Sequence, residues 1–200
     1  MLNAAIIDYR VGNIFSMNQA LLKAGFNTEV TSEKKIIKKA DAIILPGVGN
    51  FGIAAVNLEP LKALIMDAVE SGVYMLGSCL GMQLLLEGSE EGQGDGLGLI
   101  KGYVIRFKGN LKTPHMGWNT VKVVKRCPIL DGIEDQHFYF VHSYYAAPLD
   151  QGTLIASTDY GGDFASIVGD GNIYGTQFHP EKSGEAGAHL LVNFAEMVKR

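Results

Sequence analysis

The sequence predicts an α/β fold. Residues 1–200 are expected to form a single domain around a mostly parallel, doubly wound sheet, with additional antiparallel strands in the C-terminal half. In the first half, short apolar runs alternate with helical segments, an order that gives parallel strands with helices on both faces of the sheet. From Gly98 onward the apolar runs are shorter and alternate with polar residues, which is typical of antiparallel strands. A chain of 200 residues with 47% hydrophobic residues is long enough for one α/β core.

The first half contains the segments that build the parallel sheet. Apolar runs predict strands, in order, at residues 4–7, 27–30, 41–45 and 73–77. Helical patterns are found at residues 18–24, 32–40 and 61–71. Gly25 is expected to end the first helix, and Ser32 is expected to cap the N-terminus of the second. The glycine-rich segments 46–52 and 92–96 are predicted to be loops.

The second half contains shorter strands and one long helix. Residues 121–124 and 137–142 alternate as antiparallel strands do, and a strand-like segment ends directly before His179. A helix is predicted over residues 185–199. Sheets of this class bind ligands at the carboxyl ends of their parallel strands. The polar motifs that follow strands are therefore the candidate functional residues.

The most informative motif is Gly77-Ser78-Cys79-Leu80-Gly81, which lies between an apolar strand and a helical apolar pattern. This is the layout of a nucleophile elbow with cysteine as the nucleophile. The sharp turn brings two backbones together, so the positions two before and two after the nucleophile require glycine. A helix N-terminus at Cys79 would also favour the thiolate. For a lone motif of this kind, a buried cysteine between two packing glycines is the simpler interpretation.

A second motif, His179-Pro180-Glu181, follows the strand-like segment near the C-terminus. His179 is suited to exchange a proton with Cys79, and Glu181 to bind the other imidazole nitrogen and stabilise the imidazolium. Pro180 restricts the backbone between them. Taken alone, these residues could equally form a surface turn. Because both motifs fall at the ends of strands, together they favour a catalytic site.

These motifs resemble those of the class I glutamine amidotransferases. Four further runs are similar to the glutaminase subunits of imidazole glycerol phosphate synthase: residues 46–52, 114–119, 140–144 and 177–183. The resemblance covers essentially the whole chain. It implies a flavodoxin-like sheet and a catalytic triad of Cys79, His179 and Glu181.

The resemblance also implies the roles of residues outside the triad. Val48 and Leu80 would supply backbone donors to an oxyanion hole that includes Gly49. Considered alone, residues 46–49 could be a phosphate-binding loop, but they lack the Lys-Ser/Thr ending of a P-loop. The residues implied to bind the substrate are Gln83, Glu91, Ser143 and Tyr144. The residues implied to contact a partner are Asn13, Trp118, Tyr139 and Lys182. Without the family, Glu91 could be a capping or solvated glutamate, and Gln83 an ordinary residue at the edge of the core.

The family implies that the chain hydrolyses L-glutamine to glutamate and ammonia without a cofactor. Its partner would be a separate cyclase subunit with a (βα)₈ barrel, in a heterodimer. That subunit would use the ammonia to make imidazole glycerol phosphate and aminoimidazole carboxamide ribotide in histidine biosynthesis. Three alternatives remain: a paralogous glutaminase that supplies another synthase such as a surface-sugar amidotransferase, a cysteine hydrolase or peptidase, and a non-catalytic regulatory module.

Two residues depart from the family pattern. Ser78 stands directly before the nucleophile, where many relatives have an apolar residue, and a buried hydroxyl there would need a hydrogen-bond partner. Arg10 occupies a position where relatives commonly have glycine, which affects the expected backbone. Cys127 has no predicted role.

Composition argues against several other functions. A net charge of −4 argues against nucleic-acid binding, and no apolar run approaches the ~20 residues of a membrane span. The N-terminal residues have no basic segment typical of a signal peptide. The two cysteines lack metal-ligand spacing, and no two of the five histidines lie four residues apart, so no metal site is expected. This use of cysteine indicates a reducing compartment, the cytoplasm.

Overall fold

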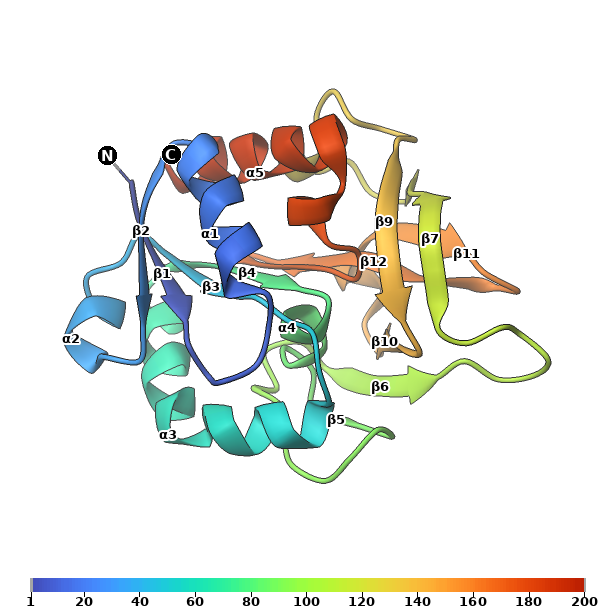
Figure 1. The fold of residues 1–200 in the computed structure, drawn as a ribbon, viewed down its shortest axis with the longest axis horizontal. Coiled ribbons are helices and arrows are strands. Elements are labelled where there is room, and N and C mark those ends of the chain that lie inside the picture. The colour runs from blue at the N-terminus through green and yellow to red at the C-terminus, as the bar shows by residue number, and fades with distance from the viewer. Residues whose placement is uncertain (1, 200) are drawn as a thin grey trace.

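The computed structural model describes residues 2–199, and within them an eight-stranded sheet runs through the centre of the molecule (Figure 1). Its strand order is β2-β1-β3-β4-β13-β12-β11-β8. The strands from β2 to β13 pair in parallel, whereas β12, β11 and β8 run antiparallel to their neighbours. The bounds are β1 (Leu2–Ile7), β2 (Phe26–Thr31), β3 (Ala42–Leu45), β4 (Tyr74–Ser78), β8 (Lys122–Val123), β11 (Leu154–Asp159), β12 (Asp163–Asp170) and β13 (Ile173–Thr176). The predicted fold class is confirmed.

Two smaller sheets lie beside the antiparallel half of the large one. One has the order β10-β6-β5, and the other is a two-stranded ribbon of β7 and β9. Their bounds are β5 (Gly88–Ser89), β6 (Gly102–Arg106), β7 (His115–Thr120), β9 (His137–His142) and β10 (Tyr144–Pro148). Three short 3₁₀ turns lie between elements of this half. They are η1 (Pro128–Leu130) between β8 and β9, η2 (Gln151–Thr153) between β10 and β11, and η3 (Pro180–Lys182) between β13 and the C-terminal helix.

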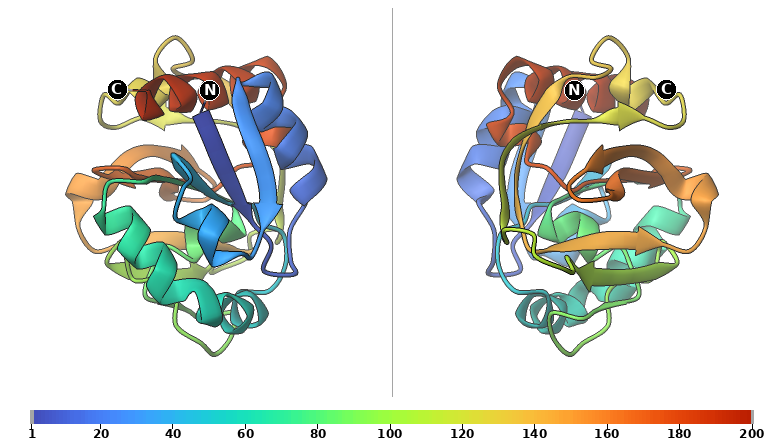
Figure 2. Two further views of the ribbon diagram at one scale, coloured as in Figure 1. Left: turned by 90° about the vertical axis from the view of Figure 1, so that its left-hand side faces the viewer. Right: turned by 90° about the vertical axis from the view of Figure 1, so that its right-hand side faces the viewer.

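Helices cover both faces of the sheet, as Figures 1 and 2 show. Their bounds are α1 (Ile14–Lys23), α2 (Lys34–Ile37), α3 (Phe51–Glu70), α4 (Leu80–Gln83) and α5 (Gly184–Val198). Successive residues of a strand point to opposite faces. Ile43 and Leu45 therefore pack into the core on the α3 side, and Ile44 packs into the core formed with α1 and α5. Within residues 2–199, no helix combines the length and apolar character needed to cross a membrane.

Helices α1 and α3 begin earlier than the sequence predicts. Asn13 caps α1 by accepting a hydrogen bond from the Ser16 amide. Asn50 caps α3 by accepting from the Ile53 amide, so the predicted loop 46–52 ends at residue 50. The predicted start at residue 61 was wrong because Pro60 lies inside the helix. Proline normally marks a helix boundary, and here packing against the sheet overrides that local preference.

Helices α2 and α4 are each a single turn. Glu33, without a side-chain hydrogen bond, is the N-cap of α2, so the predicted cap at Ser32 was wrong. α4 ends at Gln83, although the apolar pattern suggested a longer helix. The carbonyl groups of Leu84, Leu85 and Leu86 instead accept hydrogen bonds from the amides of Leu97, Ile100 and Gly98. These long-range bonds replace the i to i+4 bonds that would have continued the helix.

Candidate active site

Cys79 lies in the sharp turn between β4 and α4, and its backbone is strained. Its φ is 51° and its ψ is −104°, a region that residues other than glycine rarely adopt. A Cβ atom on Gly81 would lie 1.9 Å from the Leu45 carbonyl oxygen, and one on Gly77 would lie 2.4 Å from the carbonyl group of Gly81. This is the steric reason for glycine on both sides of the nucleophile position.

His179 reaches Cys79 because β4 and β13 pair in parallel. Thr176 is in register with Ser78, and its carbonyl oxygen accepts a hydrogen bond of 2.7 Å from the Cys79 amide. The chain therefore leaves both strands at the same edge of the sheet. The amide of His179 is then bound by the Tyr139 carbonyl at 3.0 Å, which fixes the histidine backbone against β9.

The imidazole of His179 is completely buried and bound on one side only. Its Nδ1 lies 2.8 Å from Oε1 of Glu181, whose side chain is only 2% exposed. A carboxylate accepts, so Nδ1 carries a proton. Nε2 is buried and has no hydrogen-bond partner among the described residues. A buried nitrogen of this kind calls for an explanation, and a role in proton transfer supplies one.

The electrostatic surroundings favour a charged imidazole. Burial lowers the pKa of His179, but the negative charge of Cys79 and the hydrogen bond to Glu181 outweigh it and raise the pKa to about 10. A charged imidazole in the neighbourhood of a cysteine is a setting that favours nucleophilic activation of the sulfur.

The Cys79 sulfur lies among polar groups from two segments. Gln177 Nε2 donates to Sγ at 3.7 Å, and the Val141 carbonyl oxygen lies 3.9 Å away. Sequence reasoning gave Gln177 no role, because its contact with Cys79 exists only after β4 and β13 pair. Since α4 is one turn long, few aligned peptide dipoles point at the sulfur. The expected support of the thiolate by a helix dipole is therefore small, and His179 and Gln177 are its main polar neighbours.

Cys79 opens into a cavity of about 240 Å³. The lining residues are Val48, Gly49, Cys79, Leu80, Gln83, Glu91, Val141, His142, Ser143 and Tyr144. The structure thus brings together the residues expected in the oxyanion hole and those expected to bind the substrate. Val141 and His142 are additional members that sequence reasoning missed.

Gln83 and Glu91 each have a partner within the protein. Both hydrogens of the Gln83 amide are used, one by the Tyr144 carbonyl at 2.9 Å and one by Oε1 of Gln177 at 3.4 Å. Only the Oε1 atom of Gln83 is left to accept from a ligand. Glu91 Oε2 accepts from the Phe51 amide at 2.8 Å. Glu91 therefore caps α3, one of the alternatives for this residue, while it also lines the cavity.

Residues 46–49 pass directly against the elbow. A Cβ atom on Gly47 would lie 2.5 Å from the Leu80 Cβ, so only glycine permits this approach. The Pro46 carbonyl accepts a hydrogen bond from the buried hydroxyl of Tyr9. Burial, followed by the charge of Cys79, raises the pKa of Tyr9 well above its usual value. Val48 remains 38% exposed at the mouth of the cavity.

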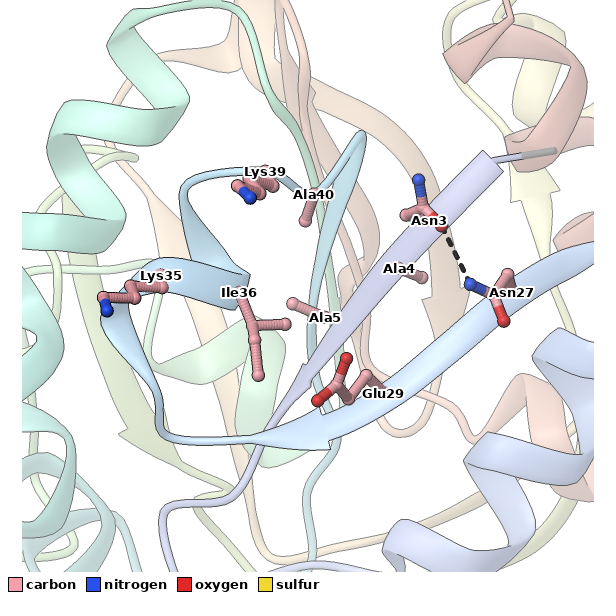
Figure 3. Close-up of a pocket in the computed structure, with 9 residues that line it drawn as sticks. All are labelled: Asn3, Ala4, Ala5, Asn27, Glu29, Lys35, Ile36, Lys39 and Ala40. Atoms are coloured by element: carbon pink, nitrogen blue, oxygen red, sulfur yellow. Dashed lines mark hydrogen bonds between the residues drawn. The ribbon is translucent and has the colours of Figure 1, made fainter.

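A larger cavity of about 310 Å³ lies elsewhere, between β1, β2 and α2 (Figure 3). Asn3 and Asn27, which are in register on β1 and β2, bind each other at 2.9 Å on one side of it, and Lys35 and Lys39 lie at its other side. Its lining contains neither cysteine nor histidine. Among residues 2–199, no group of three or more histidine, cysteine, aspartate or glutamate side chains is arranged to hold a metal ion. The cavity at Cys79 is therefore the candidate active site.

Comparison with known proteins identifies the family. The sequence model for "Glutamine amidotransferase class-I" matches residues 5–198. Imidazole glycerol phosphate synthase subunit HisH of Methanocaldococcus jannaschii is 49% identical over 195 residues, which cover 96% of this chain and 98% of that protein. The protein of the same name from Geobacillus kaustophilus is 46% identical, covering 94% of each chain.

The chain is a class I glutamine amidotransferase. Solved structures agree at the level of the fold. PurLQS from Thermotoga maritima superimposes with a TM-score of 0.80 at 21% identity, over 98% of both chains. A structure described as a glutamine amidotransferase superimposes with a TM-score of 0.79 at 19% identity, over 98% of this chain and 99% of that one.

Most residues that we expect at a partner interface of this amidotransferase lie on the ribbon of β7 and β9 or next to the triad. Trp118 on β7 is 57% exposed and stands opposite Tyr139 on β9, with ring centroids 6.1 Å apart. Lys182 is exposed in η3, next to Glu181. Asn13 instead caps α1. The exposed Met116 lies on the same face of β7 as Trp118, which extends the apolar surface.

The amidotransferase also contains a buried histidine pair beside the cavity. His115 Nδ1 lies 3.1 Å from His142 Nε2, and His142 Nδ1 lies 2.8 Å from the Tyr144 carbonyl. Burial lowers the pKa of His115 to about 4. Burial, with a smaller contribution from nearby histidine charges, lowers the pKa of His142 to about 3. Both rings are therefore neutral near pH 7, and they pack in an aromatic core with Phe107, Phe140, Tyr160 and Phe164.

We expect Glu181→Gln to fold normally but to slow glutamine turnover by about 10²- to 10⁴-fold. The neutral amide cannot stabilise the imidazolium and can select the wrong tautomer of His179. The measurement is the steady-state rate of glutamate release at matched concentration of folded protein. Glu185→Gln, which removes an exposed carboxylate at the start of α5, serves as the control. An unchanged rate in Glu181→Gln would reduce Glu181 to a structural residue.

The histidine pair predicts a loss of stability in mild acid. Because the folded-state pKa values of His115 and His142 are lowered, the unfolded chain binds more protons below pH 6.5. Their contribution to the free energy of unfolding is complete above pH 6.5. It falls by about 1 kcal/mol per pH unit for each histidine as the pH drops toward 4. Urea unfolding between pH 8 and 4.5 measures this slope.

The variant His115→Phe tests the source of that slope. It should be less stable at pH 8, because the ring of His142 loses its donor, but its stability should depend less steeply on pH. A variant with the same slope as the parent would show that other groups cause the acid sensitivity.

Proposed function

We propose that this amidotransferase is the glutaminase subunit of an imidazole glycerol phosphate synthase, and that it supplies ammonia for histidine biosynthesis. The observation that carries the proposal is the arrangement at the end of β4 and β13. There, a buried histidine bound to Glu181 through Nδ1 leaves Nε2 without a partner beside a cysteine that opens into a cavity. The names of the near full-length relatives support the same assignment. The free state of both Cys79 and Cys127 fits a reducing compartment such as the cytoplasm.

The reaction begins with attack of the Cys79 thiolate on the side-chain carboxamide of glutamine. The imidazolium of His179 stabilises the thiolate beforehand, and Glu181 holds the proton on Nδ1. The tetrahedral intermediate then collapses as His179 gives its Nε2 proton to the departing nitrogen, which leaves as ammonia. The product of this step is a glutamyl thioester on Cys79.

Loss of the thiolate charge prepares His179 for the second step. The negative charge of Cys79 is the largest cause that raises the pKa of His179. Once the sulfur is acylated, that charge is gone, so the pKa of His179 falls and the imidazole is neutral after it has protonated ammonia. It can then take a proton from a water molecule that attacks the thioester. Glutamate leaves, and the thiolate and imidazolium are restored.

The oxyanion formed in each step needs donors on the side of the cavity opposite His179. In this proposal the amides of Val48 and Leu80 supply them, with Gly49 allowing the loop to turn. Gly49 has a φ of 141°, a conformation that residues other than glycine rarely adopt. A single donor of this kind typically contributes roughly 3–4 kcal/mol to the transition state.

The polar residues of the cavity fit the amino-acid end of glutamine. The Glu91 carboxylate suits the α-ammonium group, and the remaining acceptor of Gln83 suits a donor on the substrate. Ser143 and Tyr144 form the wall on the β9–β10 side. The ammonia would pass to a separate cyclase subunit with a (βα)₈ barrel. We propose that this subunit docks on the exposed surface of Trp118, Tyr139 and Lys182, with Asn13 nearby.

A paralogous glutaminase that serves another synthase, such as a surface-sugar amidotransferase, would contain the same triad. The partner therefore has to be identified directly. Isolation of the native complex and sequencing of the subunit bound to this chain separates the two functions.

We expect Cys79→Ala to abolish glutamine-dependent synthesis in the complex and to leave synthesis from added ammonium nearly intact. The reason is that Cys79 serves only the release of ammonia. Both rates are measured on the assembled complex with saturating cyclase substrate. Cys127→Ala, at the other free cysteine, is the matched control and should keep both activities. Equal loss of both activities in Cys79→Ala would reject this division of labour.

The second prediction concerns activation by the partner. The isolated chain should bind glutamine but hydrolyse it slowly, because the Val48 amide is not held toward the oxyanion. Docking of the cyclase with its ligand should orient that amide and raise glutamate release by about 10²- to 10³-fold. Glutamate release is compared for the chain alone, with partner, and with partner plus ligand. If the chain alone already matches the liganded complex, activation through residues 46–49 is wrong.

A further inference from the structure

Ser78 precedes the nucleophile in the last position of β4, and its side chain is completely buried. An apolar residue would fill this position without any requirement for a partner, whereas a buried hydroxyl is costly unless it is hydrogen-bonded. The Ser78 hydroxyl does have a partner: Oγ donates to Oε2 of Glu181 at 3.3 Å. The hydrogen-bond partner that the buried Ser78 hydroxyl needs is thus the Glu181 carboxylate, which also binds His179.

This contact completes the hydrogen bonding of a buried carboxylate. Oε1 of Glu181 binds His179 Nδ1, and Ser78 is the partner of Oε2 among the described residues. With only 2% of the Glu181 side chain exposed, bulk water has almost no access to replace a lost donor. Both oxygens are therefore held from within the protein, and the carboxylate cannot rotate about its axis without breaking both bonds.

From this geometry we propose that Ser78 is a positioning residue of the catalytic site, which acts through Glu181 and His179 on the nucleophile. The inference rests on the glutaminase function proposed above. The hydroxyl fixes the orientation of the carboxylate, which in turn points Nε2 of His179 toward Cys79.

A role in positioning makes a kinetic prediction that a role in packing does not. Glutamine meets the other side of the cavity, where Gln83 and Glu91 lie, and Ser78 is not among its lining residues. Loss of the hydroxyl should therefore lower kcat and leave KM nearly unchanged.

The test uses the matched pair Ser78→Thr and Ser78→Val, in which a hydroxyl and a methyl group occupy nearly the same volume. Glutamate release is measured between pH 5 and 9 on the complex with the cyclase and its ligand. Ser78→Thr should retain activity within a few-fold of the parent. Ser78→Val should lose about 10- to 100-fold in kcat, the size expected for a hydrogen bond to a charged group, with KM nearly unchanged.

Ser166 offers a control within the same sheet. Its hydroxyl in β12 is also completely buried, but it has no hydrogen-bond partner among residues 2–199. Ser166→Ala should therefore leave kcat and the pH profile unchanged. A second readout does not depend on turnover. The Nδ1 proton of His179, observed by NMR in the isolated chain, should stay sharp in Ser78→Thr and broaden in Ser78→Ala, which removes the hydroxyl without adding bulk.

The outcomes separate this inference from the proposed function. Equal kcat in the Thr and Val variants, whether both retain or both lose activity, would overturn the role of the hydroxyl. If the Val variant does not fold, an unchanged Nδ1 signal in Ser78→Ala would overturn it as well. Absence of glutamate release by the parent complex would instead refute the proposed function, and the NMR comparison would still decide whether Ser78 holds Glu181 and His179.

Discussion

The parallel pairing of β4 with β13 is the interaction on which the rest of the site depends. It places the carboxyl ends of two strands side by side, although they come from distant parts of the chain. Cys79 and His179 both follow this edge, and the bond from the Cys79 amide to the Thr176 carbonyl fixes their relative height. A shift of one residue would reverse the faces of the side chains and move Ser78 away from Glu181.

The same pairing supports a strained turn. The positive φ of Cys79 lowers the stability of the folded state by an amount on the order of 1–3 kcal/mol. Such a conformation persists only when the surrounding structure holds the residue in it. Gly77 and Gly81 remove the Cβ atoms that would otherwise keep the two backbones apart. Arg10 is also held in a backbone conformation that favours glycine, with a φ of 63°. Its amide donates a hydrogen bond to Asp8 Oδ1 at 3.0 Å.

The sequence predicted the features that depend on local chemistry. The parallel strands and the elbow follow from apolar runs and glycine spacing, which act over a few residues. Features that depend on distant contacts were missed. Pro60 hid the first half of α3. Residues 137–142 form β9, as their alternation predicts, but the partner strand β7 was not predicted, because its apolar Met116 and Trp118 are exposed while the polar His115 is buried. The contact of Gln177 with Cys79 and that of Ser78 with Glu181 exist only after β4 and β13 pair, so no spacing in the sequence could indicate them.

One polar network connects the outer ribbon with the nucleophile, and its protons can be arranged in only one way. The Tyr144 carbonyl can only accept, so His142 donates to it from Nδ1 and accepts from His115 at Nε2. His115 in turn accepts at Nε2 from Asn119, whose other amide hydrogen binds the Asp159 carbonyl. From Tyr144 the path continues through the Gln83 amide to Gln177, which donates to the Cys79 sulfur. Because the pKa values of both histidines are lowered by burial, this arrangement persists at neutral pH. A displacement of β7 relative to the cavity wall would break the buried hydrogen bond between His115 and His142, so the position of the ribbon is coupled through these side chains to the wall of the cavity.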